Sequence, residues 1–321
     1  LKGTAYTYEE LQHPGTLIQP RMSTDKREVM EWDSYPTYDT YVAMMNDFAT
    51  NYPSLCRIVN AGSTVQGRAI LFAVISNNVA TEEAEPEVMY TSSMHGDEPI
   101  GMVMLINLAD HLTDNYGQPG FEDLKALVDG TELHLMPLHN PDGYVAGNRS
   151  NANSVDLNRD FEDFGTGMLA AEPENMAFDT YALAHSFVIS ANAHSGALVV
   201  NYPWDFTYDR APDDAALILM STAYASENPP MAASPWVPGG ITHGADWYRV
   251  DGSLQDWAYM HRGCLDVTIE LDDTKWPPAS RLDNLWDDNR DSYLAYVATA
   301  RYGLHGVVTD ETTGEPLNAT V

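Results

Sequence analysis

The stretch EVMYTSSMHGDEPIGMVMLINLADHL, residues 87–112, places a strand, a short loop and a helix in direct succession. EVMYTSSM is apolar enough for a strand, and PIGMVMLINLADHL is apolar almost all round, which predicts a mostly buried helix. Pro99 suits the first turn of that helix. His95 and Glu98 stand three residues apart in the intervening loop. Such a pair either shares a metal ion or belongs to an ordinary polar loop.

The alternation of strands and helices continues along the chain and predicts an α/β fold with a mixed sheet covered on both faces. Further strands are expected at 55–62, 69–77, 187–194 and 265–272, and within 132–144, where a strand runs into a turn; further helices are expected at 35–53 and 290–304. Ligands of such sheets gather outside the carboxyl ends of the strands. His95, His194 and Glu270 all fall at strand ends, so a shared site is expected there.

Charge is the strongest compositional signal of this 321-residue chain. Asp and Glu total 47 against 16 Lys and Arg, a formal net charge of −31. A bare nucleic-acid binder is excluded, because phosphate contacts need a basic face. The acidic surface indicates either strong hydration or adaptation to a salty environment. No apolar run reaches the roughly 18 residues that a membrane helix needs.

Cysteine usage indicates no disulfide framework. Cys56 and Cys264 are the two cysteines. A pair across the fold is possible in principle, but two separate buried thiols are the favoured interpretation.

Five further motifs follow in order along the chain. NPDGY covers 140–144, GNRSNANSVDLNRDF covers 147–161, ANAHSGALVVNYPWD covers 191–205, GITHGADWYRVDGSLQDWAY covers 240–259 and DVTIELDDTKWP covers 266–277. With the His-x-x-Glu pair, their order and spacing resemble the zinc metallocarboxypeptidases. The resemblance is to the regulatory branch with carboxypeptidases D, E, M and N and their bacterial relatives, and it runs from about residue 35 to the C-terminus.

The resemblance implies a metal site and a catalytic base. His95, Glu98 and His194 resemble the ligands of a single Zn²⁺. Glu270 is similar to the general base that takes a proton from the attacking water, and Arg149 to the arginine that stabilises the oxyanion. Zinc sites of this kind leave one position open and lower the pKa of bound water to about 7.

The resemblance also implies residues that bind substrate. Asn158 and Arg159 are similar to the pair that grips the terminal carboxylate of a peptide, and Tyr248 to the mobile tyrosine that covers the bound residue. Asp205 and Gln255 fall where the regulatory branch carries its pocket for basic side chains. A guanidinium such as that of Arg159 can bond both oxygens of a carboxylate.

Asp156 is similar to the carboxylate that orients the first zinc histidine through its other ring nitrogen. Asp97 departs from the family pattern, because many relatives have Asn or Arg there, and it adds negative charge near the metal.

The implied fold is an eight-stranded mixed sheet flanked by helices. The expected division of the chain is an N-terminal arm at 1–34, a zinc carboxypeptidase catalytic domain at 35–302, and at 303–321 the beginning of a truncated, transthyretin-like β-domain. The period-2 apolar pattern and the Thr-Gly turn in GLHGVVTDETTGEPLNATV support the last of these.

The expected function is a zinc-dependent exopeptidase that removes C-terminal Arg or Lys. The alternatives are a zinc hydrolase of the same fold that acts on cell-wall peptides or N-acyl amino acids, and a non-catalytic peptide-binding module. The expected partners are peptide or protein C-termini, with no nucleic acid and no membrane span. The chain is expected to be a monomer, secreted or periplasmic, since a signal peptide leaves no trace once it is removed.

Overall fold

The stretch at residues 87–112 forms the centre of the molecule. Strand β5 (Glu87–Ser92) is buried along its whole length, and helix α3 (Ile100–Asn115) follows after a short loop. A strand with apolar side chains on both faces needs cover on both sides. β5 therefore occupies an interior position in the sheet, between β6 and β7.

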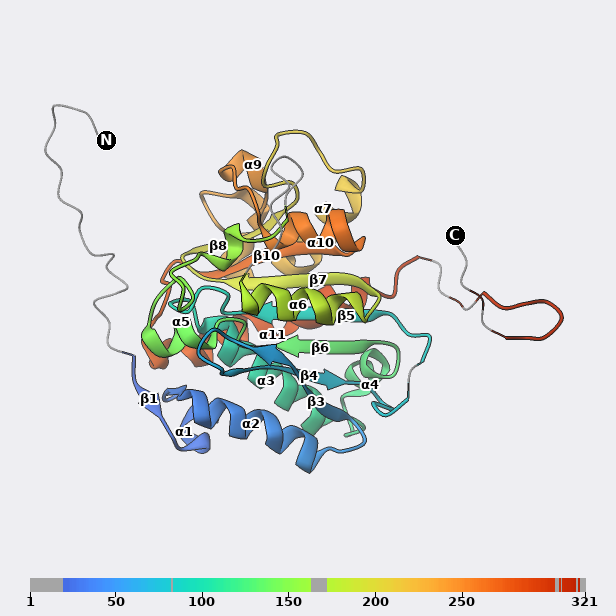
Figure 1. Ribbon diagram of the computed structural model, residues 1–321, viewed down its shortest axis with the longest axis horizontal. Coiled ribbons are helices and arrows are strands. Elements are labelled where there is room, and N and C mark those ends of the chain that lie inside the picture. Colours follow the sequence, from blue (N-terminus) through green and yellow to red (C-terminus); the bar gives the residue numbers. More distant parts are fainter. Residues whose placement is uncertain are drawn as a thin grey trace, which may run out of the picture.

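The computed structural model describes residues 20–81, 83–162, 172–303, 306, 308–315 and 317. One mixed sheet of eight strands runs in the order β3-β4-β6-β5-β7-β10-β8-β9 (Figure 1). The strands are β3 (Cys56–Ser63), β4 (Ala69–Ile75), β5, β6 (Glu132–Met136), β7 (Phe187–His194), β8 (Ala197–Tyr202), β9 (Ile241–His243) and β10 (Leu265–Asp272). The expected eight-stranded mixed sheet is confirmed.

The four central strands, β6, β5, β7 and β10, are parallel, while β4 and β8 lie antiparallel beside them. The carboxyl ends of the parallel strands therefore meet at one edge of the sheet. β3 and β4 form the expected hairpin.

Helices cover both faces of the sheet (Figure 1). One face packs against α2 (Tyr38–Asn51), α3, α7 (Asp214–Ser226) and α11 (Leu282–Thr299), and the other against α6 (Pro173–Leu183) and α10 (Leu254–Arg262). The shorter helices are α1 (Lys26–Met30), α4 (Glu122–Val128), α5 (Pro141–Ala146), α8 (Pro229–Ala232) and α9 (Gly244–Trp247). Within the described part of the chain, every helix is too short or too polar to cross a lipid bilayer.

Buried tyrosines fix α11 beneath the central strands. The Tyr90 hydroxyl on β5 donates to the Tyr293 carbonyl on α11 over 2.8 Å. The Tyr296 hydroxyl on α11 donates to the Ser190 carbonyl on β7 over 2.6 Å. Since buried hydroxyls need partners, these bonds set the position of α11 relative to the two strands.

Residues at both ends of the described chain lie outside the sheet. Of the expected N-terminal arm, residues 1–19 lie outside the described part. Residues 20–34 include β1 (Met22–Ser23), which pairs with β2 (Tyr35–Pro36), and Val29 is buried in the core. At the other end, the Leu317 amide donates to the Val308 carbonyl over 2.8 Å, which closes a turn.

Both cysteines are buried and unpaired. Cys56 begins β3, whereas Cys264 precedes β10 on the other side of the sheet order. The interpretation of two separate buried thiols is confirmed.

We expect Gly101→Ala to destabilise the fold by about 1–3 kcal/mol, the usual cost of an overpacked core position. A Cβ at Gly101 would lie 2.1 Å from Ser92 Oγ and 2.8 Å from Ala193 Cβ, between α3 and the ends of β5 and β7. Urea unfolding measures the change. Gly306→Ala is the control, because no atom of the described residues lies within 4 Å of its Cβ. Equal stability of the two variants would contradict the close approach of α3 to the sheet.

Candidate metal and active site

Three donor atoms converge where β5 and β7 end. His95 Nδ1 lies 2.9 Å from Glu98 Oε2, and His194 Nδ1 lies 3.0 Å from each of these two atoms. The three side chains are almost completely buried. The loop after β5 supplies the first two, and the last residue of β7 supplies the third. Strand pairing places them together, because Ser92 of β5 is the register partner of Ala193 on β7.

The hydrogen bond on the far side of His95 determines what these atoms can bind. His95 Nε2 lies 3.0 Å from Asp156 Oδ1, so a proton on Nε2 is donated to this carboxylate. In that tautomer Nδ1 presents a lone pair to the oxygen of Glu98 and to the second imidazole. Three lone-pair donors at such distances repel one another unless a cation lies among them. Zn²⁺ binds nitrogen and oxygen ligands at about 2.0–2.2 Å, which fits this triangle.

The protonation states of two ligands also suit a metal. Burial lowers the pKa of His194 to about 4, so this imidazole is neutral. Burial alone would raise the pKa of Glu98, but the two histidines outweigh it and hold the pKa well below its usual range. Metal ligands have to be deprotonated, so both side chains are in the required form at neutral pH.

The NPDGY motif holds the metal loop against the loop that carries Arg149. Asn140 Nδ2 donates to the Met94 carbonyl over 3.1 Å, and the Gly96 amide donates to the Arg149 carbonyl over 3.3 Å. A Cβ at Gly96 would lie only 2.0 Å from the backbone carbon of Gly143. Glycine is therefore required beside His95, because only glycine permits this close approach of two backbones.

Arg149 joins the metal ligands to the orienting carboxylate. Its Nε donates to Asp156 Oδ2 over 2.9 Å, and its Nη1 donates to Glu98 Oε1 over 3.2 Å. The guanidinium thus neutralises two carboxylates and remains about one third exposed on the cleft side. Asp156 in turn bonds both Arg149 and His95, so a single carboxylate orients the arginine and the first imidazole.

Glu270 lies beside the metal ligands without binding them. It is the register partner of His194 across the parallel pair β7 and β10. Its Oε2 has no hydrogen-bond partner among the described residues. Burial and the negative charge of Glu98 raise the pKa of Glu270 to about 8. A bound divalent cation would lower the pKa of Glu270 again, because it offsets the negative charge of Glu98.

Four of the five predicted substrate residues, Asn158, Arg159, Asp205 and Tyr248, line the same small cleft as the metal ligands, and Gln255 lies buried behind it. The cleft contains His95, Glu98, Arg149, Asn158, Arg159, His194, Asn201, Asp205, Trp247, Tyr248, Val250, Thr268 and Glu270. Asn158 Oδ1 accepts from the Leu254 amide over 2.9 Å, which fixes this amide group. Tyr248 is 48% exposed.

The inner end of the cleft is polar and closed. Asp205 is buried, and its Oδ1 accepts from Asn201 Nδ2 over 3.1 Å. Gln255 Nε2 reaches Asn201 Oδ1 over 3.4 Å. Beneath them, Asp256 accepts both from the Asp205 amide and from the Phe206 amide. Burial raises the pKa of Asp205 to about 6 and, with the charge of Asp205, that of Asp256 well above its usual range.

Sequence reasoning missed two residues of this site. Lys275 Nζ donates to Glu98 Oε1 over 2.5 Å and lies 3.6 Å from Asp97 Oδ2, so it neutralises the carboxylate that seemed to add charge near the metal. Asn201 joins Asp205 to Gln255. Lys275 and Asn201 both lie within the quoted motifs. No rule of sequence spacing shows which residue of a motif will form a hydrogen bond to a metal ligand or to a substrate-binding residue.

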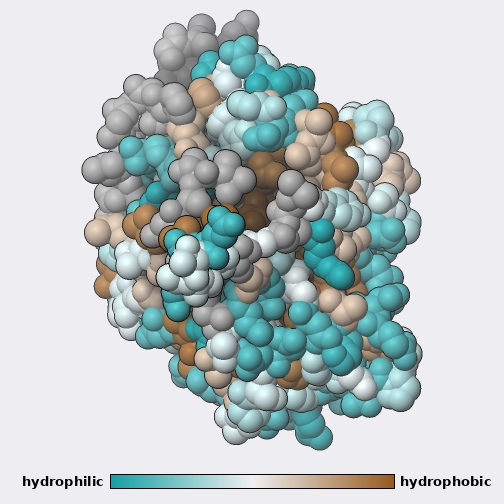
Figure 2. Space-filling view, turned by 90° about the vertical axis from the view of Figure 1, so that its right-hand side faces the viewer, coloured by the Kyte–Doolittle hydropathy of each residue, from teal (hydrophilic) through white to brown (hydrophobic). Residues whose placement is uncertain are grey.

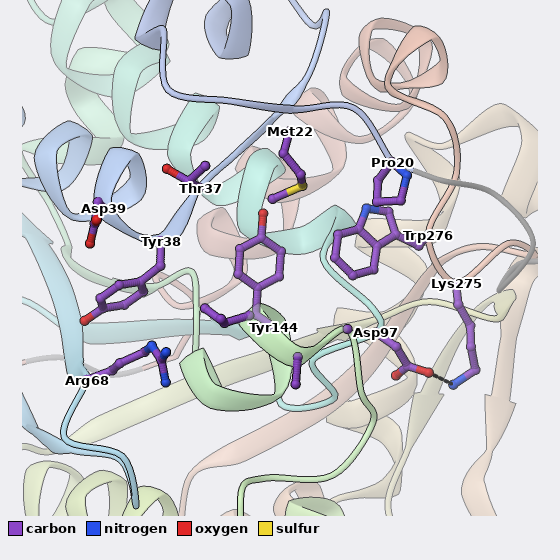
Figure 3. Close-up of a pocket in the computed structure, with 13 residues that line it drawn as sticks. Pro20, Met22, Thr37, Tyr38, Asp39, Arg68, Asp97, Tyr144, Lys275 and Trp276 are labelled. Carbon is purple, nitrogen blue, oxygen red and sulfur yellow. Dashed lines mark ion pairs between the residues drawn. The ribbon is translucent and has the colours of Figure 1, made fainter.

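A larger cavity of about 680 Å³ lies beside the metal cluster rather than in it (Figure 3). Tyr38, Tyr144 and Trp276 line it, and Asp97 and Lys275 stand where it approaches the cluster. The rings of Tyr144 and Trp276 are stacked, with centroids 5.5 Å apart. None of the three metal-binding residues lines this cavity, so the small cleft is the site where metal and substrate groups meet.

Solved structures share this fold. The carboxypeptidase A of Helicoverpa armigera matches with a TM-score of 0.72 at 18% identity, covering 84% of this chain and 74% of that one. Thrombin activatable fibrinolysis inhibitor also matches with a TM-score of 0.72 at 18% identity, covering 86% and 75%. At these identities the likeness concerns the fold.

Curated relatives are more similar in sequence. Carboxypeptidase SOL1 of Arabidopsis thaliana is 38% identical over 298 residues, which are 89% of this chain and 60% of that protein. Carboxypeptidase D of Homo sapiens is 38% identical over 302 residues, 85% of this chain and 22% of that protein. Carboxypeptidase M of Mus musculus is 33% identical over 301 residues, 86% and 67%. The chain thus spans about three fifths of the first relative and about a fifth of the second.

The family model described as "Zinc carboxypeptidase" matches residues 41–292, which contain every residue of the cleft described above. The match covers most of the chain, and the expected resemblance is confirmed. The chain belongs to the zinc carboxypeptidase family of metallopeptidases.

Proposed function

We propose that this chain is a zinc-dependent exopeptidase that hydrolyses the C-terminal peptide bond of peptides or proteins. The observation that supports this most directly is the convergence of His95, Glu98 and His194 beside Glu270, whose Oε2 has no partner among the described residues. Such an arrangement provides a metal ion and a base next to each other, as hydrolysis of an amide requires.

His95, Glu98 and His194 would hold the metal. When bound, zinc supplies a Lewis acid that polarises the scissile carbonyl and lowers the pKa of water. Glu270 takes the proton of the attacking water and passes it to the departing amine, since its side chain lines the cleft beside the metal ligands. Arg149 offers a guanidinium to the charge that develops on the carbonyl oxygen, and the loss of one such donor typically costs about 10²–10³ in rate.

Asn158 and Arg159 make the proposed enzyme an exopeptidase. Both line the cleft that contains the metal ligands, and a guanidinium can bond both oxygens of a carboxylate. A peptide bond in mid-chain offers no carboxylate to this pair. Tyr248 is the group that covers the bound terminal residue, because it lines the cleft and its side chain is half exposed.

We propose further that the terminal residue removed is Arg or Lys. The closed inner end of the cleft contains the carboxylate of Asp205 with Asn201 and Gln255 around it. A cationic side chain that reaches Asp205 gains a charge-assisted hydrogen bond worth about 1.5–3 kcal/mol. A terminal Leu or Phe would offer no charge to the carboxylate of Asp205 and would gain no such bond.

We expect Glu270→Gln to lower kcat about 10²–10⁴-fold on a peptide that ends in Arg, because the amide cannot accept the proton. Zinc content, measured by elemental analysis, should stay unchanged, since Glu270 is not one of the donors. Asp273→Asn, an exposed change just after the same strand, is the control. Full activity of Glu270→Gln would refute the assigned base. Bound zinc with no hydrolysis by the parent protein would support the non-catalytic alternative.

Asp156→Asn should weaken zinc binding about 10–100-fold, the usual cost of losing a partner that orients a metal ligand. The substitution removes the charge that His95 Nε2 and Arg149 Nε both face. Competition with a chromophoric chelator measures the dissociation constant. The exposed Asp209→Asn is the matched control. Unchanged affinity in Asp156→Asn would show that this carboxylate does not orient His95.

Asp205→Asn should lower kcat/KM for terminal Arg about 10- to 150-fold and leave that for terminal Leu nearly unchanged, as expected for a lost charge-assisted bond. Comparison of release rates from matched peptides tests this. A similar fall for both substrates would indicate a structural role instead.

The preference for Arg over Leu in the parent protein should also weaken as the pH falls below about 6. The pKa of Asp205 is about 6, so below it the carboxyl group is neutral and above it the group is ionised and attracts the cation. The ratio of kcat/KM for the two peptides between pH 5 and pH 8 measures this effect. A ratio that stays constant across this range would exclude Asp205 as the group that selects charge.

A further inference from the structure

A second cluster of histidines and carboxylates lies at the opposite edge of the sheet from the cleft. Glu87 begins β5 and Glu132 begins β6, His134 follows two residues later, and His185 precedes β7. One ligand atom from each of these four residues lies within 4.8 Å of all the others. The first three side chains are buried and His185 is half-buried.

Strand register brings the two carboxylates together. Glu87 and Glu132 are direct partners across the parallel pair β5 and β6. Like charges in that relation are destabilising, and burial increases the cost. Arg57 Nη2 lies 3.2 Å from Glu132 Oε1 and compensates one of the two charges. The second charge faces the histidines.

The imidazoles lie against these carboxylates. His134 Nε2 is 2.9 Å from Glu132 Oε1 and 3.8 Å from Glu87 Oε1. His185 Nδ1 is 2.7 Å from Glu87 Oε1. The other oxygen of Glu87 accepts from the Ser186 amide. The two histidines therefore approach the carboxylates from two sides.

His134 contains a buried nitrogen whose bonding capacity is not used. Its side chain is completely buried, and its Nδ1 shares a 2.6 Å hydrogen bond with the Tyr181 hydroxyl. Its Nε2 points into the cluster and lies 2.9 Å from Glu132 Oε1, but the angle is not that of a full hydrogen bond. When Nδ1 donates to Tyr181, Nε2 carries a lone pair, which is the form of imidazole that binds a metal.

The protonation states agree with this interpretation. Burial lowers the pKa of His134, so its imidazole is neutral at pH 7. Burial tends to raise the pKa of Glu87, but the bonds from His185 and Ser186 outweigh it and the pKa falls. The pKa of Glu132 is lowered in the same way, by His134 and Arg57 against burial.

We propose that Glu87, Glu132, His134 and His185 form a second, structural site for a divalent transition-metal ion, and that Zn²⁺ fits it best. Two imidazoles and two carboxylates are donors that zinc accepts, and four protein ligands complete a tetrahedral shell with no open position. In a tetrahedral shell, ligand atoms at about 2.1 Å from the ion lie about 3.4 Å from one another. The most widely separated of the four groups, now within 4.8 Å of the others, therefore have to move together by about 1 Å or more when the ion binds.

Such an ion would join β5, β6 and the segment before β7 at the amino ends of the parallel strands. Figure 2 views the molecule from this side, where hydrophilic residues cover much of the surface. His185 provides the route of entry, because it is the ligand that is not fully buried. The proposed site is separate from the catalytic one and shares no ligand with it.

The test uses the zinc-loaded protein, with one equivalent of zinc in the catalytic site. Titration with ZnCl₂ by calorimetry and elemental analysis after desalting should show a second equivalent per chain. The unfolding temperature should rise with zinc concentration, because an ion that binds only the folded state stabilises it. His185→Gln and Glu132→Gln should each weaken this second binding more than tenfold, at least the loss typical of a ligand's supporting partner.

The matched control is His261→Gln, a histidine on α10 outside both clusters. It should bind the second equivalent as the parent protein does. Peptide hydrolysis per catalytic zinc should be unchanged in His185→Gln, and circular dichroism verifies its fold. The proposal is overturned if the parent protein retains one zinc per chain. It is equally overturned if both cluster variants bind the second equivalent as tightly as the parent, since the ion then lies elsewhere.

Discussion

The active site depends on the repulsion among three lone-pair donors that the fold holds about 3 Å apart. His95, Glu98 and His194 cannot move apart, because each is buried and fixed to the end of a central strand or to the loop after it. Asp156 accepts the hydrogen bond of His95 Nε2 and so directs Nδ1 toward the other two donors. A proton relieves the repulsion in part, and Glu98 and Asp156 raise the pKa of His95 against the effect of burial. A divalent cation bonds all three donors at once, so the arrangement favours zinc.

Positive side chains are scarce in this chain, and several of them lie at the active site. The protein has 16 Lys and Arg residues against 47 acidic ones. Arg149 and Arg159 line the cleft, and Lys275 donates to Glu98. Under the proposed function, an anionic peptide terminus would meet these positive side chains inside the cleft of a strongly acidic molecule. This contrast would help to orient the substrate by its carboxylate.

The sequence predicted the parts of the structure whose signal is local. The strands at 187–194 and 265–272 agree with β7 and β10 to the residue, because each is an apolar run with an ionisable residue near its end. The late helix was placed at 290–304, but α11 covers Leu282–Thr299. Its first turns are rich in Asp and Asn and carry little apolar periodicity, so they did not indicate a helix.

The site residues were predicted from the resemblance to a known family, whereas several of their contacts are visible only in the tertiary structure. Motifs placed His95, Glu98, His194 and Glu270, and the structure brings all four to one cleft. The roles of Lys275 and Asn201 arise only where separate strands and loops meet. The second histidine cluster was missed for the same reason, because nothing in the sequence spacing of His134 and His185 indicates that they meet. The register that pairs Glu87 with Glu132 is not visible in the order of residues along the chain.

The direction of α11 has a consequence for how this unit can be combined with others. Because β10 ends at the cleft and α11 returns antiparallel to it, the chain leaves the sheet at the edge remote from the cleft (Figure 1). Any module fused after the last helix would therefore lie beside the sheet edge that is remote from the cleft. Its size and shape could vary freely without obstructing the entrance that substrates use.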